Sequence, residues 1–461
     1  MPVDFNTLHL LVEGYPSKLS YLPGEEIAFH CSAQARTFTA EIARIGAVRE
    51  IVWRREGIPG SFYPAPAQAY ATGCNWPVAF ALRVPDAWRS GFYEVTLTAD
   101  GATGLEAVSH ACFVVRSPQP GSEAPILLAL STNTYNAYNK WGGACLYTGA
   151  THVSFARPLE RGYVVKPVDA GYDGRAASIE PAGDPEHRRL LVYLEKHKLP
   201  LWTVSAGWWN WERRFVQWAE RNGYRIDLAV NSDLEFHAEV LAGYRLLLSV
   251  GHDEYWSWGM RDAVDDFVNR GGNVAFFSGN AVYWQVRFED EGRTMVCYKA
   301  KAHEADPVMG TAQQRLLTSI WSDPLIGRPE NLTTGLSFCR GGYVRMGQGV
   351  PRSSGAYTVY RPDHWVFTGT GLRYGDLLGA GSYIVGYEVD GCALTLQNGL
   401  PVPTHEDSTP EGFTILGASP ARLLSITPTQ CEAPEPLWAS IEPPGDLEFT
   451  ALRLFGDPSP E

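Results

Sequence analysis

The sequence lacks the features that would place the protein in a membrane or on a nucleic acid. No stretch of its 461 residues is long and apolar enough to span a bilayer, and the N-terminus has neither the basic nor the apolar segment of a secretory signal. Its 38 Lys and Arg residues are scattered, and 51 Asp and Glu residues outnumber them, for a formal charge of −13. Such a surface repels phosphates. We therefore expect a cytoplasmic protein with no nucleic-acid and no membrane partner.

The sequence also has few signs of functional cysteines. The eight cysteines are spread along the chain, with no C-x-x-C pair and no His at zinc-finger spacing. Most are expected to be buried thiols that act as small hydrophobic side chains. An amidotransferase-like thiol enzyme would have to use Cys145 or Cys297, the cysteines nearest the polar motifs. Neither stands on the sharp strand-to-helix turn that such chemistry favours.

A serine nucleophile is missing as well, because no G-x-S-x-G pattern occurs. The predicted strand Asn273–Phe277 runs into Ser278-Gly279-Asn280, which predicts a strand-to-helix turn with Asn280 at its tip. Ser278 is a poor candidate because one glycine flanks it. An amide cannot attack a carbonyl, but Asn280 can donate a hydrogen bond to a developing oxyanion. Hydrolysis would then need an activated water, and a metal ion is the common means.

The N-terminal part of the chain reads as short alternating strands separated by turn signals such as Leu22-Pro-Gly. This pattern predicts an antiparallel, immunoglobulin-like β-sandwich over residues 1–117, followed by a Pro- and Ser-containing linker at residues 118–125. The expected strands are Leu8–Val12, Glu26–Cys31, Ala47–Arg54, Val78–Val84 and Gly91–Thr98.

Beyond the linker the hydrophobic period changes, and strands alternate with helices. The pattern predicts an α/β domain with a doubly wound, amidotransferase-like parallel sheet over residues 126–430, and a C-terminal extension at 431–461 that packs on the core. The expected strands are Ile126–Leu130, Tyr224–Val230, Leu246–Val250 and Asn273–Phe277. The expected helices are Glu186–His197, Trp211–Asn222, Leu234–Leu241 and Ser257–Arg270.

The most informative motif follows the strand Leu246–Val250, where the apolar run ends in His252, Asp253 and Glu254. Open α/β sheets bind ligands beyond the carboxyl ends of their strands, so these side chains are candidates for chemistry. A plainer interpretation is that the two carboxylates cap the helix that begins near Ser257, and that the histidine is structural.

Tyrosine marks two further loops. The strand Ile126–Leu130 runs into a Tyr- and Asn-rich loop with Tyr135 and Tyr138, and Tyr172 lies in a glycine-containing turn. The chain has 22 tyrosines, so any one of them taken alone is more often a core or surface aromatic than a ligand.

Four segments together resemble the large (beta) subunit of N,N-dimethylformamidase and its homologues, an iron-dependent amidohydrolase family. The resemblance runs from about Pro125 to Arg422. Several long segments in the same order argue against a chance match. The segments are Thr134-Tyr-Asn-Ala-Tyr-Asn, Gly251-His-Asp-Glu-Tyr-Trp, Phe277-Ser-Gly-Asn and Gly386-Tyr387-Glu388-Val-Asp-Gly.

The resemblance implies a mononuclear Fe(III) held by two tyrosines and a glutamate. Here the ligands would be Tyr172, Glu254 and one tyrosine of the first loop; Tyr138 is favoured, with Tyr135 lining the substrate pocket, but the choice stays open. Phenolates and a carboxylate are hard anionic donors that suit a trivalent cation. The surrounding catalytic residues would be His252, Asn280 and Glu388, and Trp256 is a further candidate for substrate contact.

We therefore expect an iron-dependent amidohydrolase that cleaves the C–N bond of a small amide such as N,N-dimethylformamide or a related N-substituted amide. His252 or Glu388 would act as general base and then protonate the departing amine. The chain is expected to form a homo-oligomer, with a small accessory subunit as a candidate partner. A non-catalytic carbohydrate- or ligand-binding protein on the same scaffold is the alternative.

Overall fold

The computed structural model describes residues 9–174, 185–344, 355–380, 382 and 384–421. The predicted C-terminal extension, 431–461, lies outside these residues. The chain divides into two compact units. The first comprises residues 1–175, 191–277 and 284–307, and the second comprises residues 176–190, 278–283 and 308–461.

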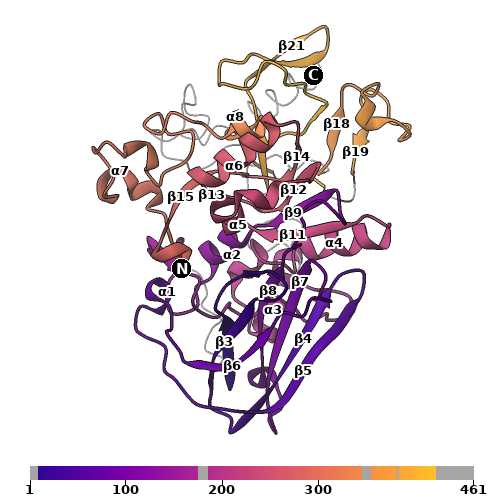
Figure 1. Cartoon of the computed structure of the whole chain (residues 1–461). Helices are drawn as coiled ribbons and strands as arrows, with labels where there is room; N and C mark the ends of the chain where they lie inside the picture. Colours follow the sequence, from indigo (N-terminus) through magenta and orange to yellow (C-terminus); the bar gives the residue numbers. More distant parts are fainter. Residues whose placement is uncertain (1–8, 175–184, 345–354, 381, 383, 422–461) are drawn as a thin grey trace. The chain divides into compact units, whose positions relative to one another are not determined.

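Two sheets occupy the N-terminal part of the first unit (Figure 1). One has the order β1-β3-β6 and the other β2-β8-β7-β4-β5, and all pairs are antiparallel except β2 with β8. The strands are β1 (Val12–Pro16), β2 (Ser20–Tyr21), β3 (Glu26–Ala33), β4 (Thr37–Ile45), β5 (Arg49–Pro59), β6 (Val78–Arg83), β7 (Gly91–Ala99) and β8 (Val108–Val115), and a short helix α1 (Ala69–Thr72) precedes β6. The immunoglobulin-like class stays a prediction.

The sequence pattern missed three of these strands, β2, β4 and β8, although β4 pairs with both β5 and β7. The Ala and Glu residues of β4 have low strand propensity, and its position is decided by burial between neighbours. Aromatic rings fill the core between the sheets: Phe29 stacks on Phe80 at 4.7 Å, and Tyr93 stacks on Phe113 at 5.3 Å between ring centroids.

A parallel sheet of order β11-β9-β12-β14 lies in the same unit, with β9 paired parallel to both β11 and β12. Strands β9, β11 and β12 are largely buried apolar runs, as coverage of both faces requires, whereas the edge strand β14 is partly exposed, with Phe277 59% accessible. The elements are β9 (Ile126–Leu130), α2 (Thr132–Tyr138), α3 (Pro185–His197), α4 (Glu212–Arg221), β11 (Ile226–Val230), α5 (Asn231–Phe236), β12 (Leu246–Gly251), α6 (Trp258–Asn269) and β14 (Asn273–Ser278).

Three local predictions were wrong. The expected helix Leu234–Leu241 is instead α5, which begins at Asn231 and ends at Phe236, followed by a separate 3-10 turn at Ala238–Leu241. The Tyr-rich segment after β9 is the short helix α2, not a loop. The segment after β14 is a turn that leads into strand β15 (Trp284–Glu289), not into a helix. Strand β15 belongs to a sheet of order β10-β16-β15-β13, formed with β10 (His152–Ser154), β16 (Thr294–Val296) and β13 (Tyr255–Ser257). Helix α7 (Ala302–Ala305) follows in the same unit.

The N-terminal strands pack directly on the parallel-sheet region within the first unit. The Phe92 and Trp208 rings stack at 3.9 Å, Arg44 pairs with Glu220 of α4 at 2.7 Å, and the Leu228 N–H donates to Ser90 Oγ at 2.9 Å. One hydrophobic core therefore includes residues from both sides of the predicted linker.

The second unit is built from small antiparallel sheets. Their elements are β17 (Ser337–Tyr343) with β20 (Glu388–Gly391); β18 (Tyr357–Val359) between β19 (Leu377–Leu378) and β23 (Gly417–Ala418); β21 (Leu394–Gln397) with β22 (Leu400–Pro403); and helix α8 (Asn331–Thr334). Across both units, the part of the chain that the structure describes holds no helix of the length and apolarity that a bilayer crossing needs.

Candidate active site

The loop after β12 meets helix α2 at the carboxyl ends of strands β9 and β12. The Tyr138 hydroxyl, at the last residue of α2, donates to Glu254 Oε2 at 3.1 Å. Both side chains are nearly inaccessible to solvent. The two motifs that the sequence analysis singled out are therefore joined side chain to side chain, as expected for parallel neighbouring strands.

A second phenol reaches the same carboxylate, and the sequence analysis did not name it. Tyr147 donates to both oxygens of Glu254 at 2.8 Å, and it accepts a hydrogen bond from the Tyr255 hydroxyl at 2.8 Å. Burial and the Glu254 charge raise the pKa of Tyr147 well above its usual value, so the phenol is a donor. Trp284 Nε1 adds a further donor to Glu254 Oε1 at 2.9 Å.

His252 stands beside this carboxylate. Its Nδ1 lies 2.8 Å from the backbone oxygen of Ser205, and its Nε2 lies 3.5 Å from Glu254 Oε2. A carbonyl only accepts, so the proton of a neutral ring is held on Nδ1 and Nε2 carries the lone pair. The side chain is 4% exposed. The Nε2 lone pair of a neutral His252 ring therefore lies on the side of Glu254.

Side chains of α2 fix the backbone of the loop that contains Glu254. Thr134 Oγ1 accepts the Glu254 N–H at 3.1 Å, and Asn133 Nδ2 donates to the Tyr255 carbonyl at 3.0 Å. These contacts explain why α2 contains small polar residues that are otherwise poor helix formers. They make the carboxylate position depend on α2.

Asp253 is held by polar side chains of the neighbouring strand and helix. Ser249 Oγ and Asn231 Nδ2 donate to its two oxygens at 2.8 and 3.2 Å. Burial raises the pKa of Asp253 to about 6. The helix α6 is capped by Ser257, whose hydroxyl accepts the Met260 N–H. The interpretation of the two carboxylates as caps of this helix is therefore wrong.

Tyr135 points to a different carboxylate than Tyr138. Its hydroxyl donates to Glu212 Oε1 at 2.6 Å, and the Ser131 N–H donates to the same oxygen at 3.3 Å. Glu212 is fully buried, and burial raises its pKa to about 7. The two α2 tyrosines, three residues apart, thus reach two separate acidic groups.

Aromatic side chains surround the phenol cluster. The half-buried Trp202 ring stacks on Tyr147 at 5.5 Å and meets Tyr138 edge-on at 6.0 Å. Lys299 Nζ lies 3.2 Å from the Tyr147 ring centroid, and Lys299 has a positive φ of 55°. Such a conformation costs energy and is typical of functional sites. None of these side chains stood in a recognisable polar motif.

The other predicted residues of the first unit lie in different surroundings. The Tyr172 ring packs edge-on against the ring of Tyr193 in helix α3, with 5.2 Å between the ring centroids. Trp256 is 1% exposed, and its ring packs against Phe276 at 6.1 Å. Their roles as ligand and substrate contact stay predictions.

The turn that contains Asn280 packs against strand β20, which begins at Glu388, within the second unit. The N–H groups of Asn280 and Ala281 donate to Asp390 on β20 at 2.9 and 3.1 Å, and a Cβ on Gly279 would lie 2.0 Å from the Glu388 carbonyl oxygen. Asn280 has a positive φ of 53°. The turn is held in a strained conformation against the strand that begins at Glu388, which is the arrangement expected of a functional turn.

The donor set of the first unit fits a hard cation. Among the described residues, no group of three or more His, Cys, Asp or Glu side chains is placed to hold a metal ion. Tyr138, Tyr147 and Glu254, however, bring phenol and carboxylate oxygens within 3.1 Å of one another in a buried place. Oxygen donors of this kind suit Fe(III) and exclude soft metals.

A family of known proteins matches this chain. The profile of the family described as N,N-dimethylformamidase beta subunit-like, C-terminal, matches residues 39–436. The chain belongs to this family. Two similar proteins carry the name N,N-dimethylformamidase beta subunit. The one from an Alcaligenes species is 27% identical to this chain over 263 residues, and the one from Paracoccus aminophilus is 25% identical over 263 residues.

Each of these two alignments covers 52% of this chain and 32% of the relative, so the chain matches about a third of the length of these dimethylformamidase subunits. Among solved structures, a chain from a study of T cell activation by toxic shock syndrome toxin-1 covers 23% of this chain at 12% identity and a TM-score of 0.16. That score is too low to carry a conclusion about the fold.

Proposed function

We propose that this chain hydrolyses the C–N bond of a small N-substituted amide at a ferric site that contains Tyr138 and Glu254. One observation carries the proposal: phenol hydroxyls converge on the buried Glu254 carboxylate with His252 Nε2 3.5 Å away, in a member of the dimethylformamidase-like family. A buried carboxylate with several phenols around it has no structural task that an apolar cluster would not perform better.

A bound ferric ion would supply the positive charge that polarises the amide carbonyl and makes a water acidic. The chain's own residues do the rest. With the ion bound, Glu254 and Tyr138 would present anionic oxygens, and His252 is proposed to accept a proton on Nε2 and return it to the departing amine; its Nε2 lies 3.5 Å from Glu254. The aromatic wall of Trp202 and Tyr147 favours an N-alkyl group over water.

The second phenolic ligand has two candidates. The resemblance to the family supports Tyr172, and the geometry supports Tyr147, whose hydroxyl already lies 2.8 Å from both oxygens of Glu254. In the first case Tyr147 positions the carboxylate by hydrogen bonding, as outer residues of metal sites do. Asn280 is proposed to orient the substrate carbonyl, and Glu388 to act as an acid or base.

The test combines metal analysis, spectroscopy and turnover. The protein purified with iron is expected to show a tyrosinate-to-iron absorption in the visible range and to release amine from formamides or acetamides. Glu254→Ala should lose the iron, the absorption and the activity together. A variant that keeps its iron and its turnover would refute the assignment.

We also propose a fold class and an assembly. The parallel order β11-β9-β12 with flanking helices supports an amidotransferase-like sheet, and the antiparallel strands before it support an immunoglobulin-like sandwich. The relatives are named as beta subunits, which supports an assembly of several chains. Light scattering of the purified chain, alone and with a candidate small subunit, measures that assembly.

A further inference from the structure

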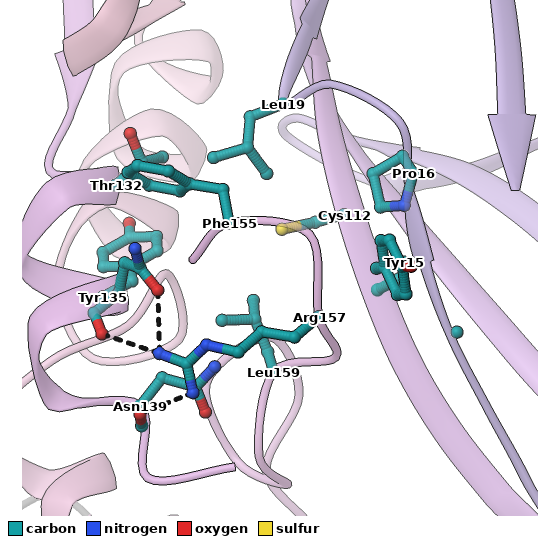
Figure 2. Close-up of a pocket in the computed structure, with 13 residues that line it drawn as sticks. Tyr15, Pro16, Leu19, Cys112, Thr132, Tyr135, Asn139, Phe155, Arg157 and Leu159 are labelled. Atoms are coloured by element: carbon teal, nitrogen blue, oxygen red, sulfur yellow. Dashed lines mark hydrogen bonds between the residues drawn. The ribbon is translucent and has the colours of Figure 1, made fainter. Parts of the chain in front are cut away.

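Arg157 is a buried arginine whose hydrogen bonds go to uncharged oxygens. It is 3% exposed, and burial lowers its pKa only to about 10, so it stays charged at neutral pH. Its Nε donates to the Ser154 carbonyl at 2.8 Å. The rest of the guanidinium contacts the end of helix α2 and the turn that follows it (Figure 2).

The guanidinium holds the residues on both sides of Tyr138. Nη2 donates to the carbonyl and to Oδ1 of Asn136 at 3.2 and 2.9 Å, and Nη1 donates to the carbonyls of Asn139 and Trp141 at 2.8 and 2.5 Å. The last carbonyls of a helix lack partners within the helix and carry partial negative charge. One planar cation therefore completes the C-terminal end of α2.

Helix α2 depends on such support. It has seven residues, too few to be stable in isolation. Beside it lies a cavity of about 30 Å³, lined by Thr132 and Tyr135 of α2 and by Cys112 of the sandwich (Figure 2). This space fits a water molecule or two, so packing beside α2 is incomplete there although all seven of its residues are buried. The hydrogen bonds of Arg157 add to that packing.

We propose that Arg157 is a positioning residue of the candidate metal site: by clamping Asn136 and Asn139, it holds the Tyr138 phenol opposite Glu254. The inference rests on the proposed function for its metal readout. A lysine cannot replace it, because one ammonium group cannot donate to the five oxygens that the planar guanidinium reaches. The segment after β10 that contains Arg157 thereby controls the candidate ligand at the end of α2.

The experiment compares Arg157→Lys with Arg161→Lys. Arg161 also donates from Nη1 to two backbone carbonyls, those of Leu105 and Val108, at 2.6 and 3.0 Å, but it does not hold α2. Arg157→Lys is expected to weaken ferric-ion affinity ten- to a hundredfold, roughly the effect of removing an outer residue of a metal site, and to shift the tyrosinate absorption. Arg161→Lys should change neither.

Amide hydrogen exchange gives a readout that needs no metal. The N–H of Asn139 should exchange faster in Arg157→Lys than in the wild type. Its exchange rate should be unchanged in Arg161→Lys. Equal exchange and equal iron affinity in Arg157→Lys and wild type would overturn the proposal, as would equal losses in both variants. If the wild type binds no iron, the proposed function fails and exchange alone decides whether Arg157 holds α2.

A milder variant covers the case in which Arg157→Lys does not fold. Asn136→Ala removes the Oδ1 contact with Arg157 and the donation from Nδ2 to the Val153 carbonyl. It is expected to weaken iron affinity severalfold with the same shift in absorption. Unchanged affinity and absorption in a folded Asn136→Ala protein would sink the proposal.

Discussion

Tyr138 and Glu254 lie 116 residues apart in the sequence, and the phenol hydroxyl donates to the carboxylate at 3.1 Å. Two different secondary structure elements deliver them, a short helix after β9 and a loop after β12. Because β9 and β12 are paired parallel neighbours, the segments that leave their carboxyl ends meet at one edge of the sheet.

The two tyrosines of α2 should differ in what their loss affects. Tyr138→Phe is expected to lower iron content and turnover at least tenfold with a small change in stability, because its hydroxyl lies at the site. Tyr135→Phe should keep iron and turnover but lose about 1–3 kcal/mol of unfolding free energy, since Glu212 loses a donor while buried. Metal analysis and urea unfolding distinguish the effects of the two variants. A Tyr135→Phe protein that lacks iron would assign the ligand role to Tyr135 instead of Tyr138.

Tyr147 and Tyr172 compete for the role of second phenolic ligand. If Tyr172 is the ligand, Tyr172→Phe loses about half of the visible absorption, and Tyr147→Phe keeps its intensity but lowers turnover, because Glu254 loses one donor to its oxygens. If Tyr147 is the ligand, Tyr147→Phe loses about half of the visible absorption and Tyr172→Phe keeps its intensity. Resonance Raman spectra of the loaded variants count the tyrosinates directly.

The buried Glu212 predicts a pH-dependent stability. Its pKa is raised to about 7 from an ordinary value of 4.5, so stability is greatest below pH 4.5 and falls as the pH rises toward 7, by roughly 3 kcal/mol at most. Glu212→Gln keeps an oxygen that accepts from Tyr135 and Ser131, and it should abolish this decline. Urea unfolding at pH 5 and pH 8 measures it.

Glu220, in the same helix, is the matched control for Glu212. Burial opposes ionisation there too, but hydrogen bonds from Arg44 and the Ala47 N–H outweigh it and lower the pKa of Glu220. Its charge therefore contributes stability above pH 4.5 that is lost in acid. Glu220→Gln should lose stability at pH 8, and a gain there would contradict the electrostatic account of both residues.

Gly279 is predicted to be intolerant of any side chain. A Cβ there would lie 2.0 Å from the Glu388 carbonyl oxygen, which is backbone and cannot swing aside. Gly279→Ala should lose about 1–3 kcal/mol of stability and reduce turnover, because Asn280 moves with the turn. Gly412→Ala, in the same unit with no atom within 4 Å of the added Cβ, is the control. Full activity in Gly279→Ala would remove Asn280 from the proposed chemistry.

The sequence by itself determined the strands and helices with a strong hydrophobic period. The predicted strands Ile126–Leu130 and Asn273–Phe277 and the helix Glu186–His197 agree with β9, β14 and α3 to within a residue. Such segments are recognisable because burial of one face or of a whole strand imposes a period on the residues. The four segments that resemble the dimethylformamidase family are each contiguous in the sequence, so the sequence also indicated the family.

Only the tertiary structure decided which side chains meet. Tyr147 stands in a turn without a periodic or polar motif, and its place beside Glu254 follows from the chain path between α2 and β10. Strand β4 is likewise fixed by pairing with both β5 and β7. Helix α2 forms despite its weak helix propensity because Arg157 donates to the Asn136 carbonyl and Asn231 Oδ1 accepts the Asn133 N–H. Long-range hydrogen bonds carry no signal in the neighbouring residues, so contacts of this kind cannot be read from local pattern.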